Sequence, residues 1–235
     1  MAAKIQPIDQ QLKEIKTFAK AIKKAAKWND SGDTLLHIET HKTDKKKREY
    51  IYEFFCYIRI LKDLKANYEI EFIKGGTGGS QFPKAPGLKK NFPFFRLTNK
   101  TDGTDQFDYC AGIKVKGKAK EYSAPDISFI LDDKLNDPDY TKIKMLHDAK
   151  YKHSAKAKVS DGEFYKVGGM IRNLDCESKI GRLIAFDQFT GPLDLNGNFI
   201  LTNGKAFKEN KDHHALFSIK EAENFDIKKK PKIFG

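Results

Sequence analysis

The spacing of apolar residues changes once along the chain, and this change limits the folds that the sequence can adopt. Up to residue 65 apolar residues recur every three or four positions, which predicts amphipathic helices over residues 8–28 and 49–65. From Tyr68 onward apolar and polar residues alternate, which is typical of a strand, until a glycine-rich stretch at residues 75–79. The sequence therefore predicts two helices followed by a sheet, an α/β fold.

The rest of the chain continues this pattern in short segments separated by Gly, Pro and Asp clusters. A further helix is expected over residues 161–173. Strands are expected over residues 92–97, 109–115, 126–131, 143–151, 182–189, 199–202 and 215–219. A length of 235 residues suits one main domain over residues 49–235, preceded by a helical extension over residues 1–48.

The charge balance indicates the class of partner. Lys and Arg number 44 against 32 Asp and Glu, so the net charge of +12 favours polyanions such as nucleic acid. The basic residues are spread along the chain, which disfavours membrane binding through one basic amphipathic helix. No signal peptide or run of eighteen apolar residues is present, so we expect a soluble protein of the cytoplasm. The three isolated cysteines match no zinc spacing and are expected to be reduced thiols.

Acidic residues mark two of the expected strands. Asp126 follows Pro125 and leads into an apolar strand, and Asp148-Ala149-Lys150 ends another. Residues two apart in a strand share a face, so Asp148 and Lys150 point to the same side. If the two strands pair as a hairpin, Asp126 meets Asp148, and a divalent cation would relieve the repulsion between the carboxylates. Such oxygen ligands suit Mg²⁺, with Mn²⁺ as a substitute.

The short pattern of an acid two residues before a lysine is not specific by itself. It recurs at residues 14–16, 132–134 and 226–228, and a second Pro-Asp pair stands at residues 138–139. Context separates these cases, because Pro138 lies in a polar turn and Glu14 on a helix, whereas Asp126 and Asp148 adjoin apolar strands. For Asp148 and Lys150 alone, a surface ion pair at a strand end is the competing interpretation.

Together, Pro125-Asp126 and Asp148-Ala149-Lys150 resemble the PD-(D/E)XK nuclease superfamily. Three segments narrow the resemblance to nucleases related to the McrC subunit of McrBC restriction systems. YIYEFFCYIRIL at residues 50–61 is similar to their LYExWCxLxL helix, DAKYK at residues 148–152 to their DAKYK strand, and APDI at residues 124–127 to their xPDI strand. The resemblance covers residues 50–173. It implies an αβββαβ restriction-endonuclease-like core, followed here by extra C-terminal strands, and Mg²⁺-dependent DNA cleavage in restriction or antiviral defence.

The resemblance also implies roles for individual residues. Asp126, Asp148 and the Ala149 carbonyl would hold the metal, and Lys150 would position the nucleophile or stabilise charge. Glu53 would reach a second metal or its water shell, with Glu49 as its substitute; the alternative is a helix carboxylate paired with a basic neighbour. The basic residues expected to contact nucleic acid are Lys152, Lys166 and Arg172.

Other functions stay open at this point. The chain carries no AAA+ motor, so a partner protein would supply targeting or a motor, and a homodimer is compatible with the sequence. A non-catalytic nucleic-acid-binding module has the same charge, and an RNase or a transposition nuclease could use the same core. Three other features are interpreted as structural: residues 75–79 as a flexible turn, His147 as a core or surface histidine, and His213-His214 as part of a solvated loop.

Overall fold

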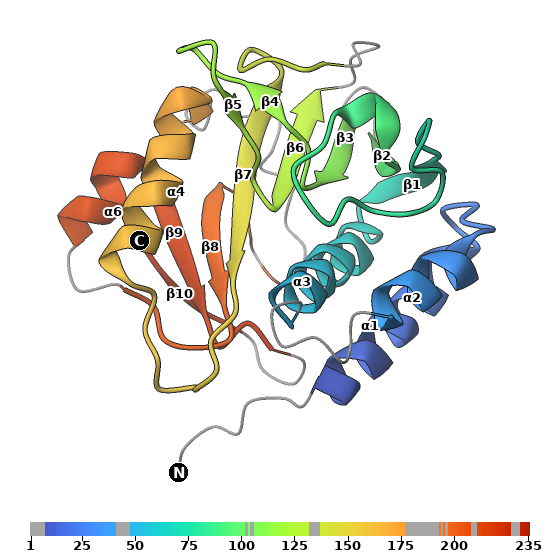
Figure 1. Cartoon of the computed structure of the whole chain (residues 1–235), viewed down its shortest axis with the longest axis horizontal. Helices are drawn as coiled ribbons and strands as arrows, with labels where there is room; N and C mark the ends of the chain where they lie inside the picture. Colours follow the sequence, from blue (N-terminus) through green and yellow to red (C-terminus); the bar gives the residue numbers. More distant parts are fainter. Residues whose placement is uncertain are drawn as a thin grey trace.

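In a computed structural model the chain folds around one large sheet with helices on both faces (Figure 1). The structure describes residues 8–40, 48–101, 103, 106–131, 137–176, 193, 195, 197–207, 211–226 and 231–235. The helices are α1 (Ile8–Lys23), α2 (Ser31–Glu39), α3 (Arg48–Leu64), α4 (Asp161–Asn173) and α6 (Lys211–Phe217), with a short 3-10 helix at Lys89–Asn91. The expected α/β class is confirmed.

The sheet has eight strands in the order β1-β2-β3-β6-β7-β8-β9-β10. Neighbours from β1 to β7 are antiparallel, β7, β8 and β9 are parallel, and β10 returns antiparallel to β9. A separate hairpin joins β4 and β5. The strands are β1 (Tyr68–Ile73), β2 (Phe94–Asn99), β3 (Gln106–Ala111), β4 (Val115–Lys116), β5 (Tyr122–Ser123), β6 (Ile127–Leu131), β7 (Ile143–Lys150), β8 (Asn198–Thr202), β9 (Ile219–Glu223) and β10 (Lys232–Phe234).

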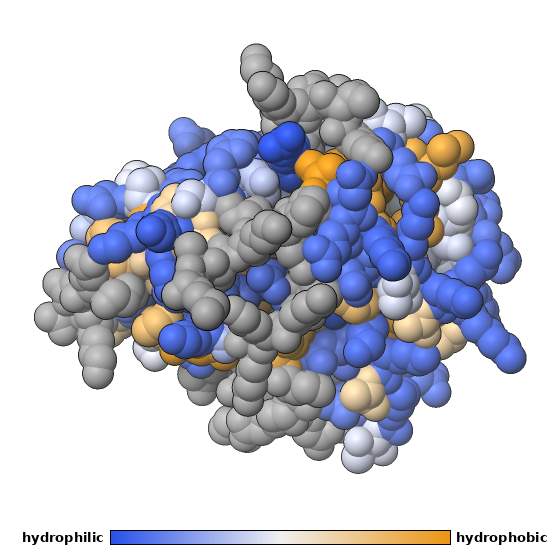
Figure 2. All heavy atoms as spheres, turned by 90° about the horizontal axis from the view of Figure 1, so that it is seen from below, coloured by the Kyte–Doolittle hydropathy of each residue, from blue (hydrophilic) through white to orange (hydrophobic). Residues whose placement is uncertain are grey.

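The helices divide the core into two layers, one on each face of the sheet. Helix α3 packs between α1 and the sheet, and the buried side chains of α1, α3 and this face form one cluster. Helices α4 and α6 cover the other face with a second cluster, which includes Phe164, Ile171 and Phe217. Because α1 shares its core with α3, the helical extension and the main domain are packed as one body. On the face seen from below, most of the described surface is hydrophilic (Figure 2).

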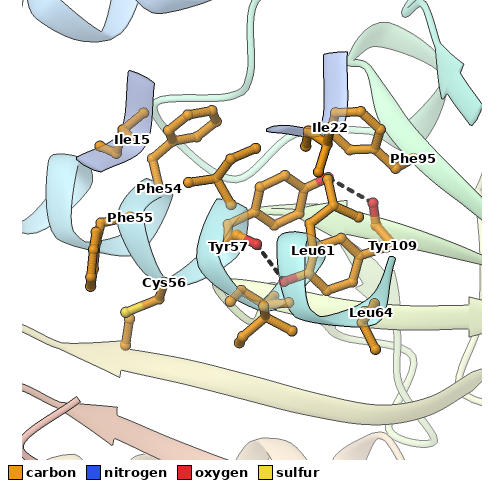
Figure 3. Close-up of a cluster of buried hydrophobic side chains, with 14 of the residues drawn as sticks. Ile15, Ile22, Phe54, Phe55, Cys56, Tyr57, Leu61, Leu64, Phe95 and Tyr109 are labelled. Carbon is orange, nitrogen blue, oxygen red and sulfur yellow. Dashed lines mark hydrogen bonds between the residues drawn. The ribbon is translucent and has the colours of Figure 1, made fainter. Parts of the chain in front are cut away.

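Helix α3 is fixed across the sheet by two stacked tyrosines (Figure 3). The Tyr57 hydroxyl donates to the Tyr109 carbonyl at 2.8 Å, and the Tyr109 hydroxyl donates to the Tyr57 carbonyl at 2.9 Å. Their rings stack at 4.4 Å between centroids, and both residues are fully buried. A buried polar group left without its partner costs about 1–3 kcal/mol, so this reciprocal pair fixes how α3 lies on β3. It thereby positions Glu53, one turn earlier on α3.

Most of the expected elements are present with small shifts in their ends. The helices expected over residues 49–65 and 161–173 correspond to α3 and α4. The first helix ends at Lys23 instead of residue 28, and α2 was not expected. The strand expected over residues 215–219 is wrong except at its last residue, because residues 211–217 form α6 and the strand begins at Ile219. The strand expected over residues 182–189 lies outside the described residues.

Two further expectations concern cysteines and membranes. Cys56, Cys110 and Cys176 are free thiols buried in the core, as expected for reduced cysteines. Among the helices that the structure describes, none combines the length and apolar character needed to cross a membrane.

Candidate functional site

The expected hairpin between the two acidic strands is present, formed by β6 and β7. Their antiparallel register pairs Ile127 with His147, which brings Asp126, just before β6, level with Asp148. The Ala149 N–H donates to Asp126 Oδ2 at 2.7 Å, so the first carboxylate is bonded to the strand that carries the second. Asp148 is 3% exposed. The sheet register therefore places two carboxylates side by side, one of them buried.

Lys150 lies on the same side of β7 as Asp148, as the strand period predicts. Its Nζ contacts Asp148 Oδ2 directly, and its side chain is largely buried. Burial by itself lowers the pKa of Lys150, but the charges of Asp148, Asp126 and Glu53 outweigh it, so its pKa is raised on balance. Lys150 is consequently a fixed cation in contact with a buried carboxylate.

Glu53 approaches this group from α3, on the facing layer. Burial raises its pKa to about 7, with added repulsion from Asp148 and Glu49 and partial relief from Lys150. The pKa of Asp126 is also raised by burial, by Asp148 and by Glu53, although Lys150 and the Ala149 N–H act in the opposite direction. Three carboxylates from three elements thus interact electrostatically, and Lys150 neutralises only part of their charge.

A cavity of about 200 Å³ opens beside this group. Its lining residues come from α3, from the end of β7 and from α4: Glu49, Glu53, Ala149, Lys150, Tyr151, Glu163 and Lys166. Asp126 and Asp148 are not among them, so of the four residues Glu53, Asp126, Asp148 and Lys150 only Glu53 and Lys150 line the cavity. Tyr151 and Glu163 were not expected at the site. The Ser160-x-x-Glu163 pattern that starts α4 was readable as a capping box, which the structure contains, but it gives no sign of the cavity.

The three basic residues expected to contact nucleic acid have different surroundings. The Lys152 amine donates to Glu163 Oε1 at 2.6 Å, and its side chain is only 13% exposed. The Arg172 guanidinium lies 4.3 Å from the centre of the Phe217 ring, on the far side of α4 from the cavity residues Glu163 and Lys166. Of the three, Lys166 is the one that lines the cavity.

The donor atoms match a hard divalent cation in their chemistry. Asp126, Asp148 and Glu53 offer carboxylate oxygens, and the Ala149 carbonyl points to the same side of β7 as its N–H, toward Asp126. Within the described residues, however, no group of three or more His, Cys, Asp or Glu side chains is assembled as a metal site. The amine of Lys150 contacts Asp148, so a cation would have to share or displace that contact. The residues fit Mg²⁺ by ligand type.

The remaining candidate features are structural. His147 is buried between Phe129 and Phe199, where burial lowers its pKa to about 4. The expectation of a solvated loop at His213-His214 is wrong, because both lie on α6 and His214 is buried 2.8 Å from Glu221.

The glycine-rich turn after β1 is closed by its own backbone. The amides of Gly75, Gly76 and Gly78 donate to carbonyls of Gly79, Lys90 and Asn91. These N–H groups are therefore not available to cradle a phosphate.

Comparison with known proteins gives no relative for this arrangement. No protein-family model matches the chain, and neither a curated protein nor a solved structure matches it significantly. The functional argument therefore depends on the residues of the site and on the resemblance of its motifs.

Proposed function

We propose that this chain is a metal-dependent nuclease of the PD-(D/E)XK type that hydrolyses DNA phosphodiester bonds. The observation that carries the proposal is the meeting of Asp126 with Asp148-Ala149-Lys150 on the paired strands β6 and β7, with Glu53 facing them. The order from α3 to β8 matches the αβββαβ succession that the motif resemblance implies if β1 and β2, which lie between α3 and β3, and the separate β4-β5 hairpin are counted as additions to it. The similarity to McrC-related nucleases extends the proposal to restriction or antiviral defence, with a partner protein for targeting.

In this proposal each residue has a defined task. Asp126, Asp148, Glu53 and the Ala149 carbonyl would hold Mg²⁺, which supplies Lewis-acid stabilisation and a more acidic bound water. Lys150 carries a fixed positive charge beside the carboxylates, where it can orient the attacking water or stabilise charge on the phosphate. Lys166 lines the same cavity and can bind a non-bridging phosphate oxygen. Lys166 attracts an anionic substrate, whereas the carboxylates of the cavity repel it.

Cleavage assays on defined substrates test the proposal. Purified protein is incubated with supercoiled plasmid, linear duplex, single-stranded DNA and RNA, each with Mg²⁺, Mn²⁺ or EDTA. We expect nicked or linear DNA with either metal and none with EDTA. Asp148→Asn and Lys150→Ala should each lower the cleavage rate by at least about 100-fold, as for groups that act on the reacting phosphate.

A matched control comes from the second Pro-Asp pair of the chain. Asp139 lies in an exposed turn, where its carboxylate accepts bonds from Thr141, so Asp139→Ala should leave cleavage unchanged. Cleavage in excess chelator, or full activity of Asp148→Asn, would contradict the proposal.

One observation favours a second candidate, a nucleic-acid-binding module without catalysis. The direct contact between Lys150 and Asp148 is also what a structural ion pair would form, and no three-carboxylate metal site is assembled in the described part of the chain. Such a module would bind DNA with the affinity that a charge of +12 provides. It would not cut any substrate with any metal, and Asp148→Asn would leave its DNA affinity unchanged.

A further inference from the structure

Helix α1 presents a stripe of lysines to the solvent. At 100° per residue, Lys13, Lys16, Lys20 and Lys23 fall within an arc of about 80°, and all four are exposed. Lys16 pairs with Glu39, but no described carboxylate pairs with Lys13, Lys20 or Lys23. In the sequence the basic residues are spread along the chain. The structure instead gathers part of them on one helix face.

A basic groove lies beyond the end of α1, and the stripe lysines themselves do not line it. This groove has a volume of about 460 Å³ and lies between the turn after α1, the end of α3 and strands β1 and β2. Lys27, Lys65, Arg96 and Lys100 line it, against two acids, Glu69 and Glu71. Arg96 is also paired with the buried Asp108, so the three lysines supply the unneutralised positive charge. The amines of Lys65 and Lys100 donate to the backbone carbonyls of Ala21 and Lys65, so no carboxylate neutralises them in these bonds.

We propose that the lysine stripe of α1 and this groove form a second nucleic-acid-binding surface. It binds the phosphate backbone at a distance from the cleavage cavity. The proposal takes its partner from the proposed function. Helix α3 links the two surfaces, because Glu53 lines the cavity near its start and Lys65 follows its end. Twelve residues of helix span about 18 Å, the rise of about five base pairs. At this separation the proposed surface would bind DNA that flanks the cut.

Nucleic acid fits this surface better than a membrane does. A helix that binds a lipid surface inserts its apolar face, whereas the apolar face of α1 is buried against α3. The buried residues on that face are Leu12, Ile15, Ala19 and Ile22. The surface can therefore attract an anion only through charge, and a row of lysines repeated at each helical turn matches a regularly charged backbone.

Binding measurements with matched charge variants test the surface. A labelled 30-base-pair duplex is titrated in EDTA, so that binding is measured without cleavage. The test variant is Lys13→Ala/Lys20→Ala/Lys23→Ala. The control, Lys84→Ala/Lys90→Ala/Lys116→Ala, removes three exposed lysines from other elements, so both variants carry the same net charge. Alanine is a good helix former, so the test variant should keep the melting temperature of the parent.

The test variant should bind the duplex on the order of 10- to 100-fold more weakly at 100 mM salt. Its slope of log K against log salt should fall by about 2 to 3, since each phosphate contact contributes about 0.9. The control should stay within about twofold of the parent. Equal affinities of the two variants would overturn the proposal. Loss of binding to phosphatidylserine vesicles or to polyglutamate, with DNA affinity unchanged, would also overturn it. Parent protein that binds DNA through these lysines but never cuts would instead contradict the proposed function alone.

Discussion

Replacing Glu53 with glutamine should remove a loss of stability that the parent protein undergoes as the pH rises. The pKa of Glu53 is about 7 in the folded state, against an ordinary value of 4.5. The folded protein therefore keeps the proton over a range in which the unfolded chain has lost it. Stability is then fully present below pH 4.5 and is lost as the pH rises toward 7. A shift of this size corresponds to about 3 kcal/mol in the free energy of unfolding, as an order of magnitude.

The stability curve of the parent protein alone shows only part of this change, because His147 acts in the opposite direction. Its pKa is lowered to about 4 by burial, so the unfolded chain binds a proton that the folded state does not. Its contribution is lost as the pH falls from about 6.5 toward 4. The two changes overlap between pH 4.5 and 6.5 and partly cancel. Subtracting the curve of Glu53→Gln from that of the parent removes the contribution of His147.

The assay is urea unfolding followed by circular dichroism at pH 5, 6, 7 and 8, with EDTA present. Relative to the parent, Glu53→Gln should gain about 3 kcal/mol in free energy of unfolding between pH 5 and pH 8. Glu49→Gln is the control, because Glu49 is an exposed carboxylate on the same helix, one turn away. Parallel curves for the parent and Glu53→Gln would show that Glu53 is not held against the aspartates, and the three-carboxylate arrangement would have to be abandoned.

Three other changes have defined outcomes. Mg²⁺ at 100 times its dissociation constant should stabilise the parent by about 2.7 kcal/mol in thermal melts but leave the stability of Asp148→Asn unchanged. Equal stabilisation of the two proteins would place the ion elsewhere. Tyr57→Phe should lower the free energy of unfolding by about 1–3 kcal/mol in urea, because the buried Tyr109 carbonyl loses its donor. Gly87→Ala should destabilise by about 1–3 kcal/mol, since its Cβ would lie 2.1 Å from the Phe92 ring, whereas Gly162→Ala has open space and should be neutral or slightly stabilising.

The sequence predicts those elements in which most of the buried side chains are apolar. Helix α3 and strands β6 and β7 satisfy this condition, and their expected positions differ from the observed ones by at most about one residue. Helix α2 does not, because Ser31 and Thr34 occupy its buried face and break the apolar period. The short apolar run around Phe217 was expected as a strand, since periodicity cannot separate helix from strand over so few residues.

The same distinction applies to the candidate site. Asp126, Asp148 and Lys150 are adjacent in the strand period or across one hairpin, so local rules bring them together. Glu163 reaches the cavity only because the chain crosses from β7 through α4 to β8, which local spacing does not encode. For the same reason Lys152 was expected from the sequence to contact nucleic acid, whereas in the fold its amine donates to Glu163.

The charge balance of the site is the physical reason for proposing a cation beside these carboxylates. Asp126, Asp148 and Glu53 carry three negative charges when ionised, and Lys150 supplies one positive charge, which leaves a net charge of −2. In a largely buried group this net charge is costly, and the raised pKa values of Glu53 and Asp126 reduce it because they favour protonation. A second lysine would also reduce the repulsion, but the neighbouring Lys152 is engaged by Glu163. In the proposed function a divalent cation would restore neutrality without protonation, and Mg²⁺ suits this task because hard cations prefer carboxylate oxygens.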